Sequence, residues 1–345
     1  MTKTVDHAGH AFRILRESEA WPPQDRNCWR ACFAIDGRIA GYSPWSEATR
    51  RQVAWVYGQY VKHTRAEGLP PGLDPAGVRS FAAAALDRGC APRSVARYLQ
   101  CLSLISIVLQ PGHAKDFAWL KALSTTLLKA AAATPKQKAG RQRPAEEILA
   151  LGLGEMDRAD LSCGSWTQYR RYRNGLILAL WICLPERLKA FTAIRLRDIA
   201  VDLSWIDFPQ EHQKTGTAIR RVVPTVLRPY LRRYLDEIHS VHAKGHDRLW
   251  IVQSGEPAGP KALYGAVREM TERGLGVALS PHRLRDCAAR FVVEEMTSEA
   301  RLASVILNHR DERSTAPYLE GASTLLASRN ALALMKQSES KALTG

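Results

Sequence analysis

Six side chains in this 345-residue sequence have the types and order needed for a metal-free attack on a phosphodiester. They are Arg187, Lys214, His282, Arg285, His309 and Tyr318. A phosphoryl group in transfer spreads negative charge over its oxygens, and fixed cationic donors stabilise that charge. Arginine suits this task because its planar fork can hold two oxygens and stays charged. Tyr318 is the candidate nucleophile, since a phenol that is helped to lose its proton can form a covalent intermediate.

Each of these residues alone also has an ordinary structural interpretation. A tyrosine such as Tyr318 usually packs, and Arg187 alone would usually be a surface charge. Lysines such as Lys214 often serve solubility in hairpin turns, and His309 could simply end a helix. Only the order and spacing of all six in one basic chain favour a shared chemical role.

The overall charge favours a polyanionic partner. The sequence has 49 Lys and Arg residues against 34 Asp and Glu residues, a formal net charge of +15. A surplus of this size is typical of proteins that bind nucleic acid, although a merely basic protein stays possible on charge alone.

The cysteines and the apolar segments favour a cytoplasmic protein. Seven scattered cysteines without a CxxC pair argue against a zinc module or a disulfide framework, and fit a reducing cytosol. The longest apolar run, Leu176 to Leu184, is too short to cross a bilayer, and the N-terminus opens no signal-peptide core. We expect no cofactor, no metal and no membrane partner.

Apolar spacing and breaks in composition predict two folded regions and a linker. Residues 1–43 form an N-terminal extension without a clear assignment, in which Trp29 to Tyr42 could form a hairpin around an Asp-Gly pair. Residues 44–133 read as a helical domain. Residues 134–144 carry cations and no anion, as an exposed linker does. Residues 145–345 form the second domain with a C-terminal tail.

Local start signals place the helices of the first domain. Ser46 is a candidate cap, and Asp74-Pro75 and Pro92 are typical first positions. Helical spacing after Pro92 predicts a buried face, and a further helix is expected over about 114–132.

The second domain is expected to be mainly helical with a small antiparallel sheet. A helix over about 169–184 is apolar almost all round and should be buried. Two or three strands should follow around residues 204–208 and 218–224, with Lys214 near the turn. Ser280-Pro281 predicts the start of the helix that carries His282 and Arg285.

Five short motifs carry a family resemblance. They are Leu184-Pro185-Glu186-Arg187-Leu188, His212-Gln213-Lys214-Thr215-Gly216, Ser280-Pro281-His282-Arg283-Leu284-Arg285, Leu307-Asn308-His309, and Tyr318 preceded by Ser314-Thr315. Over about 145–325 the chain resembles the catalytic domain of the tyrosine recombinases, the phage-integrase family. The helical region before it resembles the family's core-binding domain in pattern and placement.

The resemblance implies a role for each group. Tyr318 would attack a strand and form a 3′-phosphotyrosyl link. Arg187 and Arg285 would hold the non-bridging oxygens, and Lys214 would protonate the departing 5′ oxygen. The chain would thus be a site-specific DNA recombinase that cleaves and rejoins DNA in integration, excision or resolution.

The histidines complete the implied set, and three positions depart from the family pattern. His282 would take part in proton transfer at the tyrosine, and His309 would hydrogen-bond the phosphate. Ala190 stands where an acid often follows the first arginine, Asp286 where histidine is frequent, and Asn308 where glycine is common. Without an acid at 190, the first arginine would be held less firmly or would rely on another carboxylate.

The implied partner is double-stranded DNA with a short inverted-repeat site. Cations of the helical domain and the linker are the candidate DNA contacts: Arg93, Arg97, Lys136, Lys138, Arg141 and Arg143. The resemblance also implies a homotetramer on DNA, a monomer or weak oligomer when free, and association with a bacterial nucleoid.

Other functions stay open at this point. A type IB topoisomerase shares the chemistry without joining two partners, and a non-catalytic DNA-binding protein could use the same fold. An RNA-binding structural protein is supported by charge alone. The sequence does not distinguish integration from excision, dimer resolution or transposition.

Overall fold

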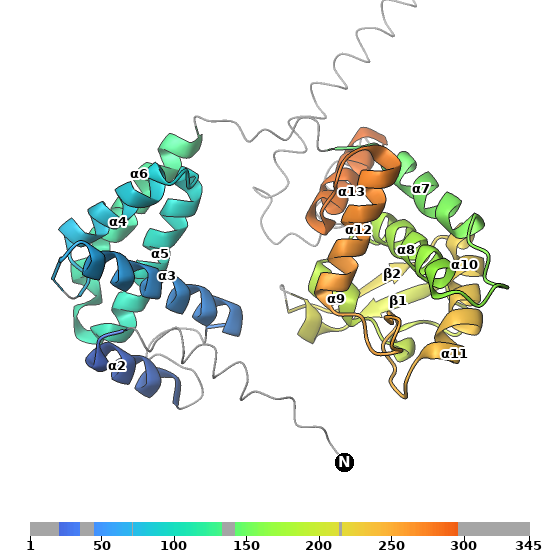
Figure 1. The fold of residues 1–345 in the computed structure, drawn as a ribbon, viewed down its shortest axis with the longest axis horizontal. Helices are drawn as coiled ribbons and strands as arrows, with labels where there is room; N and C mark the ends of the chain where they lie inside the picture. Colours follow the sequence, from blue (N-terminus) through green and yellow to red (C-terminus); the bar gives the residue numbers. More distant parts are fainter. Residues whose placement is uncertain (1–20, 35–44, 71, 133–141, 214–215, 296–345) are drawn as a thin grey trace, which may run out of the picture. The chain divides into compact units, whose positions relative to one another are not determined.

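The computed structural model describes residues 21–34, 45–70, 72–132, 142–213 and 216–295 (Figure 1). The chain divides into two compact units, Met1–Gln137 and Lys138–Gly345, each with its own apolar core. The division falls inside the segment that the sequence predicts as a linker. Among the described residues, no helix combines the length and the apolar character needed to cross a membrane.

The first unit is a bundle of helices whose starts follow local capping signals. Its helices are α2 (Pro23–Ala34), α3 (Glu47–Ala66), α4 (Pro75–Asp87), α5 (Pro92–Leu109) and α6 (Ala118–Ala132), with the 3₁₀ segment η1 (Pro111–Phe117) before α6. Ser46 accepts the backbone N–H of Thr49, and Asp74 accepts those of Ala76 and Gly77. The predicted starts at Ser46, Asp74-Pro75 and Pro92 are therefore confirmed.

Helix α5 supplies the buried face predicted after Pro92. Val95, Leu99, Leu102 and Ile105 are all fully buried, at one helical turn after another. The helix expected over 114–132 begins later, because Pro111–Phe117 forms a 3₁₀ turn before α6.

The hairpin expected between Trp29 and Tyr42 is wrong for its first part. Trp29 lies in α2, and residues 35–42 fall outside the described residues. The helix is held by aromatic burial: the Trp21 ring meets Trp29 at 5.4 Å and Tyr57 at 4.8 Å. The Tyr57 hydroxyl also donates to Asp25 at 2.5 Å. Part of the unassigned extension therefore belongs to the helical unit.

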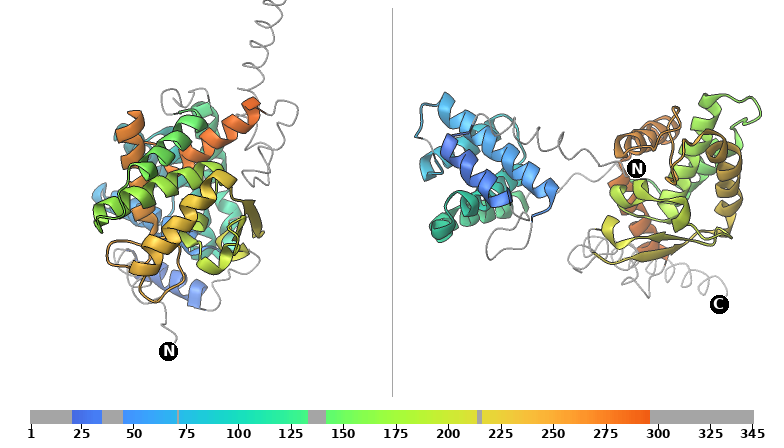
Figure 2. Two further views of the ribbon diagram at one scale, coloured as in Figure 1. Left: turned by 90° about the vertical axis from the view of Figure 1, so that its right-hand side faces the viewer. Right: turned by 90° about the horizontal axis from the view of Figure 1, so that it is seen from below.

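The second unit is built around one buried helix. This helix, α8 (Trp166–Cys183), contacts α7 (Ala145–Asp157), α12 (Pro260–Leu275) and α13 (Pro281–Glu295), as Figures 1 and 2 show. Helices α7 and α8 approach closely at two glycines, since a Cβ at Gly152 would lie 2.9 Å from the carbonyl oxygen of Gly175. The predicted buried helix over 169–184 is confirmed, with every residue from Gly175 to Ile182 buried.

A short hairpin packs on this helical core. Strands β1 (Trp205–Phe208) and β2 (Ile219–Val222) pair antiparallel, with Trp205 opposite Val222 and Asp207 opposite Arg220. Ile199 adds an isolated bridge to Ile206. The fold class expected from the sequence, mainly helical with a small antiparallel sheet, is confirmed.

Short helical segments complete the second unit. They are α9 (Leu188–Ala193), η2 (Leu196–Asp198), η3 (Gln210–His212), η4 (Thr225–Leu227), α10 (Arg228–Arg233), the π-helical η5 (Tyr234–His239) and α11 (Ser240–His242). Phe191 of α9 stacks between Trp181 at 4.3 Å and Trp250 at 5.5 Å. This aromatic stack fixes the position of α9 relative to the end of α8.

Candidate active site

The segment between α8 and α9 carries Arg187 and is contacted by Arg285, two of the predicted site arginines. Arg285 is 6% exposed, and its guanidinium Nη1 donates to the carbonyl oxygen of Pro185. Arg187 follows only two residues later and stands at the N-cap position of α9. Two basic motifs about a hundred residues apart in sequence thus meet at one short loop, residues 184–187.

Arg187 carries a donor that nothing among the described residues uses. Its Nη1 atom is buried and has no hydrogen-bond partner there. A buried unpaired donor is costly, so such a group calls for an explanation. An incoming oxygen anion would satisfy it, and arginine forks bind such oxygens strongly.

Helix α13 presents His282 and Arg285 one turn apart. The Ser280 hydroxyl accepts the backbone N–H of Arg283 at 3.4 Å, so the predicted helix start is confirmed. The His282 side chain is 81% exposed and its Nε2 lies 4.0 Å from Asp286, too far for a hydrogen bond. Asp286 is buried and pairs with Arg283 at 2.9 Å. His282 is therefore accessible, whereas Arg285 is held in the protein interior.

Three of the six predicted site residues, Lys214, His309 and Tyr318, lie outside the described residues. The nearest described neighbour of Lys214 is Gln213, which is buried. His212 is partly buried at the end of η3, and this burial lowers its pKa.

Glu186 is a functional candidate to which the sequence motifs assign no role. It is 1% exposed, and its carboxylate accepts hydrogen bonds from Arg221 and Gln213. Its carbonyl oxygen accepts the indole N–H of Trp181 at 2.7 Å. Ala190, at the position where an acid often stands in the family, is buried and apolar. In the sequence, a role for Glu186 was indicated only by its place, as an acidic residue directly before Arg187.

Three of the predicted DNA contacts lie among the described residues, and each also makes a hydrogen bond within the protein. Arg93 and Arg97 lie exposed on α5, where Arg93 donates to the carbonyl oxygen of Ala131 at 3.4 Å and Arg97 donates to Gln52 and Gln100 at 3.2 Å each. Arg143 donates to the carbonyl oxygen of Leu275 at 3.3 Å, at the end of α12. Lys136, Lys138 and Arg141 lie outside the described residues.

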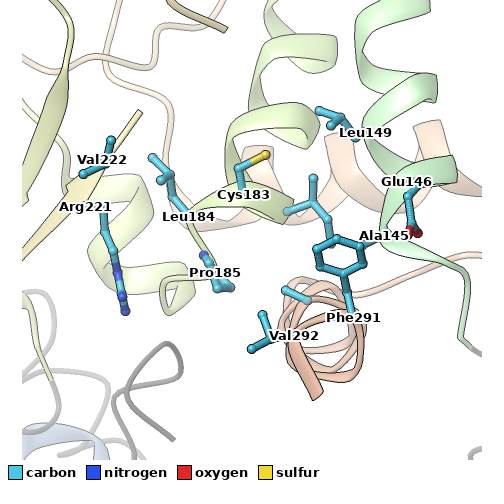
Figure 3. Close-up of a pocket in the computed structure, with 12 residues that line it drawn as sticks. Ala145, Glu146, Leu149, Cys183, Leu184, Pro185, Arg221, Val222, Phe291 and Val292 are labelled. Atoms are coloured by element: carbon cyan, nitrogen blue, oxygen red, sulfur yellow. The ribbon is translucent and has the colours of Figure 1, made fainter. Parts of the chain in front are cut away.

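An apolar cavity of about 420 Å³ lies beside the 184–187 loop (Figure 3). Arg221 and Val222 of β2 line one end, and Phe291 and Val292 of α13 line another. Burial raises the pKa of the Cys183 thiol in this cavity to about 11, so the thiol stays protonated at neutral pH and is a poor nucleophile. The cavity itself therefore offers packing surface rather than reactive groups.

No metal site is found in the part of the chain that the structure describes. No group of three or more His, Cys, Asp or Glu side chains there could hold an ion. The cysteines are free thiols, and burial raises the pKa of Cys32, Cys101 and Cys287.

Comparisons with known proteins point to one family. No model of a protein family matches the chain. The chain is 28% identical over 153 residues to a putative tyrosine recombinase XerC of Pseudomonas aeruginosa, a match that covers 41% of this chain and 36% of that protein. It is 27% identical over 149 residues to a tyrosine recombinase XerC of Pseudomonas fluorescens, covering 43% of this chain and 48% of that protein. The match thus spans less than half the length of each curated relative.

Solved structures show the same fold. The structure of the XerH site-specific recombinase bound to its difH substrate matches with a TM-score of 0.56 at 14% identity, covering 94% of this chain and 91% of that one. A lambda integrase dimer bound to a core site matches with a TM-score of 0.53 at 16% identity, covering 85% and 94%. The chain therefore has the fold of the tyrosine recombinases. The tyrosine recombinase fold predicted from the sequence motifs is therefore confirmed, and the 184–187 loop and α13 are the parts of it that carry Arg187 and Arg285 here.

Proposed function

We propose that this chain is a site-specific DNA recombinase that cleaves and rejoins duplex DNA through a 3′-phosphotyrosyl intermediate. The observation that carries this proposal is the meeting of Arg285 and the Arg187 loop at the carbonyl oxygen of Pro185. Two guanidinium groups that hold the same phosphate can neutralise the charge of a phosphoryl transition state.

In the proposed reaction the Tyr318 oxygen attacks a backbone phosphorus and the bond from phosphorus to the 5′ oxygen breaks. Lys214 gives that oxygen a proton, so a 5′ hydroxyl leaves. Arg187 and Arg285 hold the non-bridging oxygens throughout. A 5′ hydroxyl from a second strand then attacks the phosphotyrosine, releases Tyr318 and restores a phosphodiester, so no external energy source is needed.

The two histidines take different parts in the proposal. The exposure of His282 at the start of α13 suits a group that moves a proton at an incoming tyrosine. His309 would hydrogen-bond the phosphate.

The proposed substrate is duplex DNA with a short inverted repeat. XerH has been solved on a palindromic difH substrate, and this chain shares its fold with a TM-score of 0.54. The exposed Arg93 and Arg97 of α5 are proposed to contact the phosphate backbone, as are the linker cations. Assembly as a homotetramer on DNA and association with the nucleoid belong to the same proposal.

A suicide-substrate assay tests the chemistry. The full chain would be mixed in EDTA with labelled, nicked duplexes that carry candidate inverted repeats from the DNA next to its gene. We expect an adduct that survives denaturant, needs no metal, and is abolished by Tyr318→Phe while DNA binding is kept. Tyr264→Phe is the matched control, because Tyr264 is an exposed tyrosine of α12 at 39% exposure.

Other outcomes would point to other functions. Tight binding without an adduct on any candidate site would favour a non-catalytic DNA-binding protein. If the protein forms the adduct and relaxes supercoiled DNA but never joins two sites, the result would favour a topoisomerase. An adduct that persists in Tyr318→Phe would show that the nucleophile is wrongly assigned.

A further inference from the structure

Two consecutive residues of the 184–187 loop contact other parts of the candidate site, and the next residue carries a buried donor. The carbonyl oxygen of Pro185 accepts from Arg285 of α13. Glu186 accepts from Gln213 and Arg221, which belong to the hairpin region. Arg187 carries the unpaired buried donor. The position of this loop therefore decides where two guanidinium groups lie.

The Glu186 carboxylate joins the loop to both sides of the β1–β2 connection. Its Oε1 atom accepts from Arg221 Nε at 2.9 Å and forms an ion pair with Arg221 Nη2 at 2.8 Å, and its Oε2 atom accepts from Gln213 Nε2 at 3.1 Å. Gln213 follows η3 on the β1 side, and Arg221 lies within β2. One buried carboxylate thus ties two separate segments of the hairpin region to the residue directly before Arg187.

This arrangement is unlike an ordinary stabilising ion pair. Glu186 is 1% exposed and the Arg221 side chain 14% exposed. Taking two charges out of water costs about as much as their attraction returns, so a buried pair is weak evidence of a stabilising role. Such a pair does impose one geometry, because either charge left alone in the interior is costly. Glu186 is therefore better suited to fixing the loop than to strengthening the fold.

We propose that Glu186 is a positioning residue for the recombinase reaction, which sets the orientation of Arg187 by holding the loop against Gln213 and Arg221. The inference rests on the proposed function and deepens it. Glu186 does not touch the DNA; it acts through Arg187. Loss of its charge should therefore slow the chemical step at saturating DNA and leave the affinity for DNA unchanged.

The kinetic experiment compares two isosteric changes in the same hairpin region. Glu186→Gln keeps the shape of the side chain and removes its charge. Asp207→Asn is the matched control, since Asp207 pairs with Arg220 on the exposed face of the same two strands. The measured quantities are the first-order rate of adduct formation at saturating nicked duplex and the Kd for a Tyr318→Phe version of each variant.

We expect Glu186→Gln to slow adduct formation about tenfold to a hundredfold at an unchanged Kd, the range that loss of hydrogen bonds to a charged group gives. Asp207→Asn should stay within about twofold of the unmodified chain, as exposed ion pairs contribute little. Gln213→Met keeps the Arg221 pair, and should slow the reaction in the same direction if Glu186→Gln fails to fold. A rate for Glu186→Gln equal to that of the control would overturn the proposal, as would a defect confined to Kd.

A second measurement separates this proposal from the proposed function. Hydrogen exchange on the free protein should show faster exchange in peptides covering 185–191 and 209–213 for Glu186→Gln, and no such change for Asp207→Asn. If the unmodified chain forms no adduct, the proposed function fails, and exchange still decides whether Glu186 fixes the loop. Unchanged exchange in both peptides would overturn the positioning role whatever the adduct assay gives.

Discussion

Two adjacent arginines of β2, Arg220 and Arg221, make ion pairs of nearly the same length in opposite surroundings. Arg220 meets Asp207 at 2.7 Å, with side chains 59% and 43% exposed. Arg221 meets Glu186 at 2.8 Å, with side chains 14% and 1% exposed. Successive residues of a strand face opposite sides, so one pair faces solvent and the other faces the 184–187 loop.

The difference shows that the distance within an ion pair says little about its role. In water the Coulomb attraction is screened, and exposed pairs contribute about 0–1 kcal/mol. In the interior the attraction is stronger, but so is the cost of removing either partner. Of these two ion pairs, only the buried Arg221–Glu186 pair can therefore couple the hairpin to the candidate site.

The largest expected effect is a loss of stability when Arg221, the cation that pairs with Glu186, is removed. Arg221→Ala should lower the free energy of unfolding by about 3–5 kcal/mol, because it leaves an uncompensated buried carboxylate. Urea denaturation of the full chain, followed by tryptophan fluorescence, measures this loss. Arg220→Ala is the control and should cost less than about 1 kcal/mol.

A double change tests the reason for that loss. Glu186→Leu combined with Arg221→Met removes both charges and should recover most of the stability lost in Arg221→Ala. Equal losses in Arg220→Ala and Arg221→Ala would mean that burial does not distinguish the two pairs.

The next effect concerns Arg285, a buried arginine that donates to the carbonyl oxygen of Pro185 in the loop that carries Arg187. Arg285→Ala should slow adduct formation roughly a hundredfold or more, since removing one donor to a developing oxyanion costs about 2.7–4 kcal/mol of barrier. The rate at saturating nicked duplex is the measurement.

Arg268→Ala is the control for this change, because Arg268 is an exposed arginine of α12. A rate unchanged in Arg285→Ala would remove Arg285 from the proposed machinery and leave Pro185 as a structural contact only.

Much of the fold could be predicted from the sequence because its signals are local. Ser46, Asp74 and Ser280 cap helices with their own side chains, within three residues. The buried face of α5 follows from the spacing of Val95 and Leu99 within one helix. The contact between Arg285 and the loop that carries Arg187 could be expected only from the family resemblance, since no local rule relates the two motifs.

What escaped prediction depends on contacts between distant residues. Glu186 meets partners 27 and 35 positions away, so nothing near it in the sequence marks it as buried. Trp29 was expected near a hairpin, but it packs with Trp21 in the helical core. Arg143 donates to the carbonyl oxygen of Leu275, 132 positions away, and no local signal predicts that contact.

The smallest expected effect is the loss of stability when the exposed Arg220–Asp207 pair is removed, and it depends on pH. The hydrogen bond from Arg220 lowers the pKa of Asp207. A carboxyl whose pKa is lower in the folded state contributes stability above its unfolded pKa of about 3.9, and loses it as pH falls through the folded value. Asp207→Asn should therefore cost less than about 1 kcal/mol at pH 7 and nothing once both states are protonated.

Urea denaturation of Asp207→Asn and the unmodified chain at pH 7 and pH 3, each at low and high salt, measures this contribution. The difference should shrink at pH 3 and also in high salt, because exposed charges are screened. The loss from Arg221→Ala should persist in high salt, since salt screens buried pairs much less. If salt erased both losses alike, Glu186 would be accessible to ions and could not hold the loop before Arg187 in one geometry.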